Sequence, residues 1–264
     1  PLRRMLKCHA ITQHELCRQQ KSSPWFPRPM LPGLKVAQAI HNLALSGFSL
    51  ACFLGTLHAC LTFEWAAPQS QGGLYGAICV EAGEHTTDAV SKGLRTWFLW
   101  YQLSKYWEFM DTVLLIINRK PVSFLHAYHH TVVAFTSWTW TRADLRLAAG
   151  GVLFNTFVHV LMYWYYFVCT VPWLKAPWWK KYLTTLQILQ FVVSLVMAVF
   201  FVMAHQSSLA AGHAGCTGWN AFLASTAFNF TLLGLFMQFY ASTYNDNKAK
   251  KKSKGFVDKN NKRA

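Results

Sequence analysis

Apolar residues run along the chain in six long stretches that are separated by more polar segments. The stretches cover residues 36–61, 94–117, 124–141, 148–169, 180–204 and 220–244. An α-helix needs about 20 residues to cross the hydrocarbon core of a bilayer, so each stretch is a candidate span. The third stretch is the shortest, and we expect it to begin at the membrane interface. The pattern predicts an all-α fold, a polytopic membrane helix bundle.

The segments outside the apolar stretches are longest at the N-terminal end (1–35), between the first and second stretches (62–93) and at the C-terminal end (245–264). Residues 1–35 begin with Pro rather than Met and contain no apolar segment followed by a cleavage site, so we expect a cytosolic segment with a truncated start. Residues 245–264 are rich in Lys and Asn, which is typical of a disordered tail. The membrane domain is therefore predicted to occupy residues 36–244.

The composition agrees with a membrane protein and explains the net charge. Hydrophobic residues make up 53% of the chain and charged residues 13%, which is too apolar for an ordinary soluble domain. The formal net charge is +15, but the basic residues lie at the ends and in short connections, and no aromatic-basic nucleic-acid motif is present. We therefore expect no nucleic-acid partner and interpret the charge as a topology signal.

The distribution of Lys and Arg predicts the orientation of the bundle. With six spans both termini lie on one side, and this side holds 20 of the 25 basic residues, against four on the other side. Loops rich in Lys and Arg stay in the cytosol. Both termini, together with the connections 118–123 and 170–181, are therefore predicted to be cytosolic.

Ionisable and amide side chains interrupt four of the apolar stretches, and such groups are rare in a membrane unless they serve a function. The motifs that carry them are KYWEFMDT, HAYHH, NTFVHVLMYWYY and TTLQILQF. In chain order their polar residues are Lys105, Glu108 and Asp111; His126, His129 and His130; Asn155, His159, Tyr163 and Tyr166; and Gln187 and Gln190. In the first, third and fourth motifs these residues are three or four positions apart and share one helix face.

The polar residues also share a depth in the membrane. Counted at 1.5 Å per residue from the predicted cytosolic ends, Asp111, His129 and Gln187 lie about 9–10 Å deep. On the same count His159 and Gln190 lie about 14–15 Å deep. Polar groups from four helices therefore meet at one level in the cytosolic half, and we expect a single site there.

Each motif also has a purely structural interpretation. Lys105 and Glu108 can form a buried ion pair that neutralises itself. The glutamines can hydrogen-bond neighbouring helices, and the tyrosines can be core or interface aromatics. The three crowded histidines are harder to explain in this way, because they would leave polar atoms unpaired in apolar surroundings. His41 and His58 stand alone on the first stretch and are interpreted as packing residues.

The spacing HxxHH at residues 126–130 is a fragment of the histidine boxes of membrane di-iron oxygenases. Such enzymes need several boxes, and the remaining histidines of this chain form no second HxxH, HxxxH or HxxHH. One box together with His159 supplies too few imidazole ligands for di-iron chemistry. We therefore predict no metal and expect the imidazoles to act on substrate directly.

The four motifs, in this order and spacing, resemble the ELO family of very-long-chain fatty acid elongases, from about Leu34 to Tyr244. The resemblance implies seven spans, six of them around an acyl tunnel, so the first family helix is expected to be missing here. It implies an acyltransferase of the endoplasmic reticulum membrane, a 3-oxoacyl-CoA synthase that joins acyl-CoA to malonyl-CoA and releases CO2 and CoA. No cofactor is implied besides the co-substrate malonyl-CoA. Implied partners are a 3-ketoacyl-CoA reductase, a dehydratase and an enoyl reductase, which process the 3-oxo product.

The resemblance also assigns roles to the polar residues. His129, aided by His159, is expected to take the acyl group or polarise the thioester, because imidazole can act as nucleophile or base near neutral pH. His126 and His130 are expected to handle protons and stabilise negative charge. The other motif residues orient the rings (Glu108 and Asp111) or bind substrate (Lys105, Asn155, Tyr163, Tyr166, Gln187 and Gln190). Tyr128, in HAYHH, indicates polyunsaturated acyl chains within the family.

Basic residues flank the predicted cytosolic mouth of the site. They are Arg119, Lys120, Lys175, Lys180 and Lys181. Such residues either bind the phosphates of CoA or only enforce the topology. At the opposite side, Cys79 and Cys216 are the only cysteines in the predicted lumenal loops, where redox conditions permit disulfides. We predict that they bridge the loop 62–93 to the loop 205–219.

Two other functions fit the same residues less well. A metal-dependent membrane lipid oxidase would contain iron in the purified protein, whereas an elongase would need none. A proton-coupled transporter would use the His, Glu and Asp side chains as a proton relay and would move substrate without consuming malonyl-CoA. Paired halves with matching broken helices, which favour a transporter, are not visible in the sequence.

Overall fold

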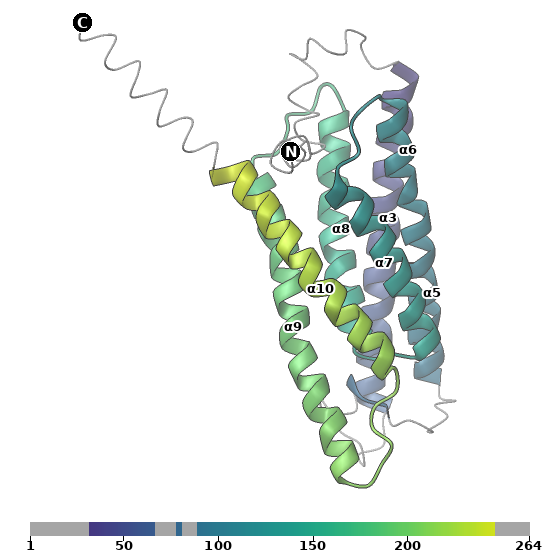
Figure 1. The fold of residues 1–264 in the computed structure, drawn as a ribbon. Helices are drawn as coiled ribbons and strands as arrows, with labels where there is room; N and C mark the ends of the chain where they lie inside the picture. The colour runs from purple at the N-terminus through teal and green to yellow at the C-terminus, as the bar shows by residue number, and fades with distance from the viewer. Residues whose placement is uncertain (1–31, 67–77, 81–88, 246–264) are drawn as a thin grey trace, which may run out of the picture.

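The computed structural model describes residues 32–66, 78–80 and 89–245, and all its elements are helices. In chain order they are α3 (Pro32–Ala66), α5 (Ala89–Trp107), α6 (Phe109–Ile117), α7 (Phe124–Ala143), α8 (Ala148–Thr170), α9 (Lys180–Ala210) and α10 (Trp219–Tyr240), followed by a π-helical turn (Ala241–Asn245) (Figure 1). The predicted all-α helix bundle is confirmed. Residues 1–31 and 246–264, which hold most of the predicted N-terminal segment and tail, lie outside the described residues.

Four of these helices are long and apolar enough to cross a membrane, judged by length and composition. They cover Gly33–Thr62, Ala148–Thr170, Lys180–Ala210 and Trp219–Tyr244. The predicted second and third spans, α5–α6 and α7, fall outside this group. α6 has only 9 residues, and α5 and α7 are less apolar because they carry charged residues and the histidine trio, respectively.

The second predicted span is not one continuous helix, which corrects the prediction for residues 94–117. A turn at Glu108 separates α5 from α6. The Glu108 N–H donates to the Ser104 carbonyl at 2.8 Å, as in an α-helix, but the Asp111 N–H donates to the Glu108 carbonyl at 3.0 Å. This tighter i to i+3 bond is a 3₁₀-type step. Hydrophobic periodicity does not reveal it, because the residues on both sides remain helical.

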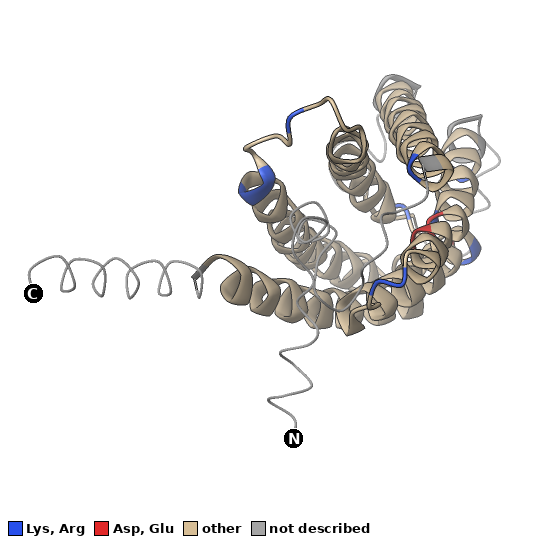
Figure 2. Cartoon of the chain, turned by 90° about the horizontal axis from the view of Figure 1, so that it is seen from above, with Lys and Arg blue, Asp and Glu red and all other residues tan. Residues whose placement is uncertain are grey.

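The helices surround a common interior. α5 packs on α7, α7 on α10, α10 on α9, α9 on α8 and α8 on α5, while α3 lies against both α5 and α8. Figure 2, a view along the bundle, shows this arrangement, with Lys and Arg on the connections at the near end. Any side chain that points inward from one helix can therefore meet side chains from several others.

The two ends of the bundle differ in chemistry. One end, called the basic end here, carries the α6–α7 connection (118–123) and the α8–α9 connection (171–179) with their Lys and Arg residues. The other, called the disulfide end, joins residues 78–80 to the α9–α10 connection (211–218). Cys79 and Cys216 form a disulfide there with Cα atoms 5.1 Å apart, and the Thr217 N–H donates to the Val80 carbonyl at 2.7 Å. The disulfide joins the two cysteines that the predicted topology pairs.

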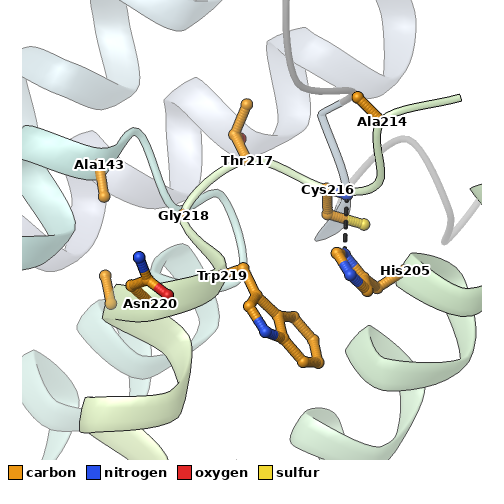
Figure 3. Close-up of a pocket in the computed structure, with 9 residues that line it drawn as sticks. Ala143, His205, Ala214, Cys216, Thr217, Gly218, Trp219 and Asn220 are labelled. Atoms are coloured by element: carbon orange, nitrogen blue, oxygen red, sulfur yellow. Dashed lines mark hydrogen bonds between the residues drawn. The ribbon is translucent and has the colours of Figure 1, made fainter. Parts of the chain in front are cut away.

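His205 fixes the turn at the disulfide end (Figure 3). Its Nδ1 accepts the Cys216 N–H at 3.0 Å, and its ring stacks on Trp219 with centroids 4.0 Å apart. Gly215 has φ +81°, and a Cβ there would lie 2.4 Å from His205 Cε1, so the turn needs glycine. Next to this turn, the interior of the bundle is filled by a core cluster that includes Tyr101, Leu145, Val152, Phe201 and Phe222.

Candidate active site

A buried charge network joins α5, α8 and the turn at Glu108. Lys105 Nζ donates to Glu108 Oε1 at 2.6 Å and to Asn155 Oδ1 at 3.0 Å. His159 Nδ1 lies 3.2 Å from both Lys105 Nζ and Glu108 Oε1. Lys105 and Glu108 are each 2% exposed, so each charge depends on its protein partners rather than on water. The ion pair therefore does more than neutralise itself, because it also holds His159 and Asn155.

The network continues to α9 through the Asn155 amide. Tyr101 OH donates to Asn155 Oδ1 at 2.9 Å, and Asn155 Nδ2 faces Gln190 Oε1 at 3.5 Å. Lys105 Nζ also lies 4.4 Å from the centroid of the Tyr101 ring, within the range of a cation–π contact. Three helices thus hold one amide and one ammonium group in fixed positions.

Asp111 belongs to a second network, which reaches α3. His41 Nε2 lies 2.9 Å from Asp111 Oδ1, and Tyr163 OH donates to Asp111 Oδ2 at 2.7 Å. The Tyr163 ring meets the His159 ring edge-on with centroids 5.6 Å apart, so the two networks touch. His41 is interpreted from the sequence as a packing residue, whereas in the structure it is the partner of a site carboxylate. An ionisable residue in an apolar stretch was the signal that could have identified it.

The histidine trio lies in the first two turns of α7. Ser123 caps this helix, because its Oγ accepts the His126 N–H at 3.1 Å. His126 Nε2 lies 2.8 Å from Thr112 Oγ1 on α6. The rings of His126 and His130 are 4.3 Å apart between centroids, and those of His129 and His130 are 5.5 Å apart. The cap and the Thr112 bond therefore hold the trio against α6.

His129 and His130 differ from the other site histidines in their bonding. Within the described part of the chain, neither residue has a hydrogen-bond partner for its ring nitrogens; their contacts are with aromatic rings. His126, by contrast, is bonded to Thr112, and His159 to Glu108. The nitrogens of His129 and His130 are therefore available to a bound molecule.

A cavity of about 160 Å³ lies among these groups. Its polar lining includes Glu108, Asp111, His126, His129, His130, Asn155, His159, Tyr163, Tyr166, Gln187 and Gln190. Met162, Phe191, Phe236 and Phe239 contribute to its apolar lining. The structure thus brings together the polar residues of all four motifs around one space. Lys105 does not line the cavity itself, but it donates a hydrogen bond to Glu108, which does.

The basic residues predicted at the mouth lie at the basic end, outside the cavity lining. They are Arg119, Lys120, Lys175, Lys180 and Lys181. Lys180 Nζ lies 5.9 Å from the ring centroid of Tyr244, and Lys181 Nζ lies 5.8 Å from that of Tyr240. These two lysines therefore connect the start of α9 to the segment at the end of α10.

The described residues hold no group of three or more His, Cys, Asp or Glu side chains placed to bind a metal ion. Lys105 Nζ, Thr112 Oγ1 and Tyr163 OH instead contact the site's His and carboxylate side chains. Hydrogen-bonding partners of this kind hold imidazole and carboxylate side chains in one orientation.

Long apolar helices around one internal cavity lined by imidazole, carboxylate and amide groups define a polytopic membrane protein with a buried polar site. The chain belongs to the ELO (GNS1/SUR4) family, whose model matches residues 13–252. The resemblance inferred from the four motifs is therefore confirmed.

Several proteins similar to this chain are named as elongases. Fatty acid elongase sre1 of Dictyostelium discoideum is 30% identical over 215 residues, which cover 81% of this chain and 74% of that protein. Fatty acid elongase A of the same organism is 32% identical over 219 residues, 80% of this chain and 73% of that protein. Very long chain fatty acid elongase 4 of Mus musculus is 35% identical over 189 residues, 68% of this chain and 56% of that protein.

Proposed function

We propose that the chain catalyses the condensing step of fatty acid elongation, in which a long-chain acyl-CoA and malonyl-CoA give a 3-oxoacyl-CoA, CO2 and CoA. Membership of the ELO family and the elongases among its relatives support a role in fatty acid elongation. The condensing reaction itself is supported by the chemistry of the cavity. It needs a nucleophile for the acyl group, a base and donors for a developing oxyanion, and no metal or other cofactor.

One observation carries this proposal: His129 lines the cavity and, within the described residues, its ring nitrogens lack hydrogen-bond partners. A neutral imidazole with a free lone pair is a nucleophile. His159 lines the same cavity, and its Nδ1 faces Glu108 and Lys105. Its other nitrogen, Nε2, is therefore the one that can meet a substrate and exchange a proton with it.

The proposed reaction proceeds in two steps. A ring nitrogen of His129 attacks the thioester carbonyl of acyl-CoA, the C–S bond breaks, and the CoA thiolate takes up the proton that the imidazole loses. Malonyl-CoA then loses CO2, and the electron pair of the broken C–C bond forms a thioester enolate. The enolate carbon attacks the acyl-imidazole and the C–N bond breaks. His159 passes to the released His129 imidazolate a proton taken up from water, which is the one proton that the overall reaction consumes.

Negative charge develops on the reacting carbonyl oxygen in both steps, and the cavity supplies donors for it. Asn155 Nδ2 faces Gln190 Oε1 at 3.5 Å, and Gln187 Nε2 faces the Met162 sulfur at 3.4 Å. Both contacts are weak, because the first is long and thioether sulfur is a poor acceptor. A substrate oxygen can replace them easily, and donors fixed in advance are effective in stabilising an oxyanion.

The same proposal places the protein in the endoplasmic reticulum membrane with the basic end toward the cytosol. CoA carries phosphates, and Arg119, Lys120 and Lys175 lie at that end, where Arg and Lys can bind them. Lys180 and Lys181 join this set. The 3-oxo product then passes to a 3-ketoacyl-CoA reductase, a dehydratase and an enoyl reductase, because its ketone has to be reduced. Polyunsaturated chains are included among the proposed substrates.

Intact-mass analysis tests the covalent step. Purified protein is incubated with acyl-CoA alone, and we expect a mass increase equal to one acyl group. The increase should be absent in His129→Ala and retained in His58→Ala, an exposed histidine on α3. If the wild-type protein forms no adduct, but malonyl-CoA still drives product formation, His129 acts by polarising the thioester and the covalent version is wrong.

Release of CO2 from malonyl-CoA separates the proposed function from its alternatives. The elongase releases CO2 and forms a 3-oxoacyl-CoA in the presence of a metal chelator. A lipid oxidase would depend on iron and oxygen, and a transporter would move substrate across vesicles without consuming malonyl-CoA. Wild-type protein that forms no 3-oxoacyl-CoA from the two thioesters would refute the proposed function.

A further inference from the structure

The Tyr101 hydroxyl on α5 bonds directly to the side-chain amide of Asn155 on α8. Tyr101 OH donates to Asn155 Oδ1 at 2.9 Å, and Lys105 Nζ donates to the same oxygen at 3.0 Å. Tyr101 and Lys105 are one helical turn apart, so two donors from one helix hold a single oxygen on its neighbour. Asn155 lines the cavity, whereas Tyr101 does not and is 2% exposed. The contact of Tyr101 with the cavity lining therefore runs through Asn155.

These two bonds decide which end of the Asn155 amide is available to a substrate. An amide oxygen has two lone pairs, and Oδ1 already accepts from two donors. A Lys ammonium has no lone pair, so the amide cannot turn its NH2 group toward Lys105 without losing a bond. Nδ2 has two N–H bonds, and the acceptor that the described residues place near it is Gln190 Oε1 at 3.5 Å. The Asn155 amide thus offers a donor to a molecule in the cavity.

The bond from Tyr101 is the one dedicated to Asn155. The Lys105 ammonium is shared among three acceptors, since it lies 2.6 Å from Glu108 Oε1, 3.0 Å from Asn155 Oδ1 and 3.2 Å from His159 Nδ1. The Tyr101 hydroxyl instead donates its single proton to Asn155 alone. Hydrogen bonds on a carbonyl oxygen polarise the amide and strengthen the bond that its N–H group donates. Tyr101 therefore affects both the direction and the strength of the Nδ2 donor.

The Tyr101 ring is held in place independently of its hydroxyl. The ring stacks on that of Trp140, on α7, with centroids 6.2 Å apart and planes at 12°. Lys105 Nζ lies 4.4 Å from the centroid of the Tyr101 ring, within the range of a cation–π contact. A phenylalanine ring can make both contacts. The packing role of the ring and the polar role of the hydroxyl are therefore separable by substitution.

We infer that Tyr101 is a positioning residue of the condensing reaction. Its hydroxyl orients and polarises the Asn155 amide, so that Nδ2 donates to the negative charge that develops on the reacting carbonyl oxygen. Donors fixed in advance are effective in stabilising an oxyanion, because they need no reorganisation during the reaction. The inference rests on the proposed condensation. Tyr101 itself makes and breaks no bond with the substrate, and it lies outside the four motifs identified in the sequence.

Two substitutions separate the hydroxyl from the ring. Tyr101→Phe leaves Asn155 Oδ1 bonded to Lys105, so it should unfold at nearly the same dodecyl sulfate fraction as the wild type. Removal of an oxyanion donor lowers kcat about 10²–10³-fold, and loss of one of the two bonds that hold the donor should lower kcat less, about tenfold. KM for both thioesters should stay within about twofold, because the affected bond forms in the transition state. Tyr101→Leu also removes the ring and should lose stability as well as kcat.

A second background shows whether the effect runs through Asn155. In Asn155→Ala, the further change Tyr101→Phe should not lower kcat again, because the donor that it orients is gone. Tyr182→Phe, at a site on α9 that is 63% exposed, is the control and should keep the kcat of the wild type.

Three results would overturn the inference. They are a wild-type kcat in Tyr101→Phe, a loss of stability in Tyr101→Phe equal to that of Tyr101→Leu, and an equal fall in kcat with and without Asn155. Wild-type protein that forms no 3-oxoacyl-CoA would instead refute the proposed function, so the two failures are distinguishable.

Discussion

Replacing Glu108 by Gln would leave the Lys105 ammonium with only the neutral partners Asn155 and His159. Replacing Lys105 by Met would leave the Glu108 carboxylate with only His159. The two charges are 2.6 Å apart and each residue is 2% exposed, so water cannot solvate the charge that remains when its partner is removed. Breaking a buried pair by removing one partner lowers the free energy of unfolding by about 3–5 kcal/mol. We expect this loss for each single variant.

The double variant Lys105→Met/Glu108→Gln contains no unpaired buried charge, so it should lose no more stability than either single variant. The coupling energy between the two sites is then about 3–5 kcal/mol. Equilibrium unfolding in mixed micelles, followed by tryptophan fluorescence during a titration with dodecyl sulfate, measures all three variants. Lys175→Met removes an exposed charge and serves as the control, with an expected change within about 0.5 kcal/mol.

Condensing activity adds a second readout to this cycle. The double variant should be no less stable than the single variants and should still lack activity, because His159 has lost the Glu108 carboxylate that faces its Nδ1 at 3.2 Å. Single-variant losses that simply add in the double variant would refute the reasoning. They would show that the two charges are stabilised independently, by water or by other groups, and that the 2.6 Å contact is not an energetic pair.

Three further predictions concern α3 and the disulfide. Gly55→Ala places a Cβ against the Trp97 ring and should lower the free energy of unfolding by about 1–3 kcal/mol. Gly47→Ala is the control and should leave stability unchanged, because nothing lies within 4 Å of a Cβ there. Equal unfolding curves for the two variants would contradict this prediction. Cys79→Ser opens a cross-link between residues 137 apart in sequence and should lower the free energy of unfolding by about 2–5 kcal/mol. Dithiothreitol should then destabilise the wild type but not the variant. His41→Phe should lower kcat by up to about 100-fold, because the Asp111 carboxylate loses its fixed position, and leave KM nearly unchanged. His58→Phe, at an exposed site on the same helix, is its control, and similar kcat values for the two variants would exclude a positioning role.

Element type follows from the sequence wherever an apolar run is long. α8 occupies Ala148–Thr170 against a predicted 148–169, because its apolar face continues without interruption between two polar connections. α9 was predicted to end at residue 204 but continues to Ala210. The polar residues after Ala204 suggested a loop, whereas His205 lies within the helix and accepts the Cys216 N–H from the following connection. That contact joins residues eleven apart and has no signature in hydrophobic periodicity.

The composition of the site could be predicted from the sequence, but its bonding could not. The depth in the membrane that the four polar motifs share was sufficient to predict that their side chains lie around one cavity. Lys105 and Glu108 are three residues apart, so their pairing was visible in the sequence. The bonds of Asp111 to His41 and Tyr163 depend on the rotation of three helices about their own axes. Spacing within one helix shows which residues share a face, but it does not show which neighbouring helix that face meets.

The polar residues of the site fall into two groups with different consequences for stability. A polar group is tolerated within a membrane bundle when neighbouring helices satisfy it. Lys105, Glu108 and Asp111 are satisfied by partners on α8 and α3, so these bonds hold α5 and α6 against their neighbours in the bundle. His129 has no such partner among the described residues, and it lines the cavity.

Removal of the His129 imidazole should therefore abolish condensation without loss of stability, because no hydrogen bond within the bundle is broken. His129→Phe, which removes an unsatisfied polar group from an aromatic environment beside Phe236, should unfold at the same or a higher dodecyl sulfate fraction than the wild type. Asp111→Asn, measured alongside, should lose both activity and stability, because Tyr163 and His41 lose a charged partner. If His129→Phe were as unstable as Asp111→Asn, the His129 nitrogens would be bonded within the bundle, and the imidazole would not be free to take an acyl group.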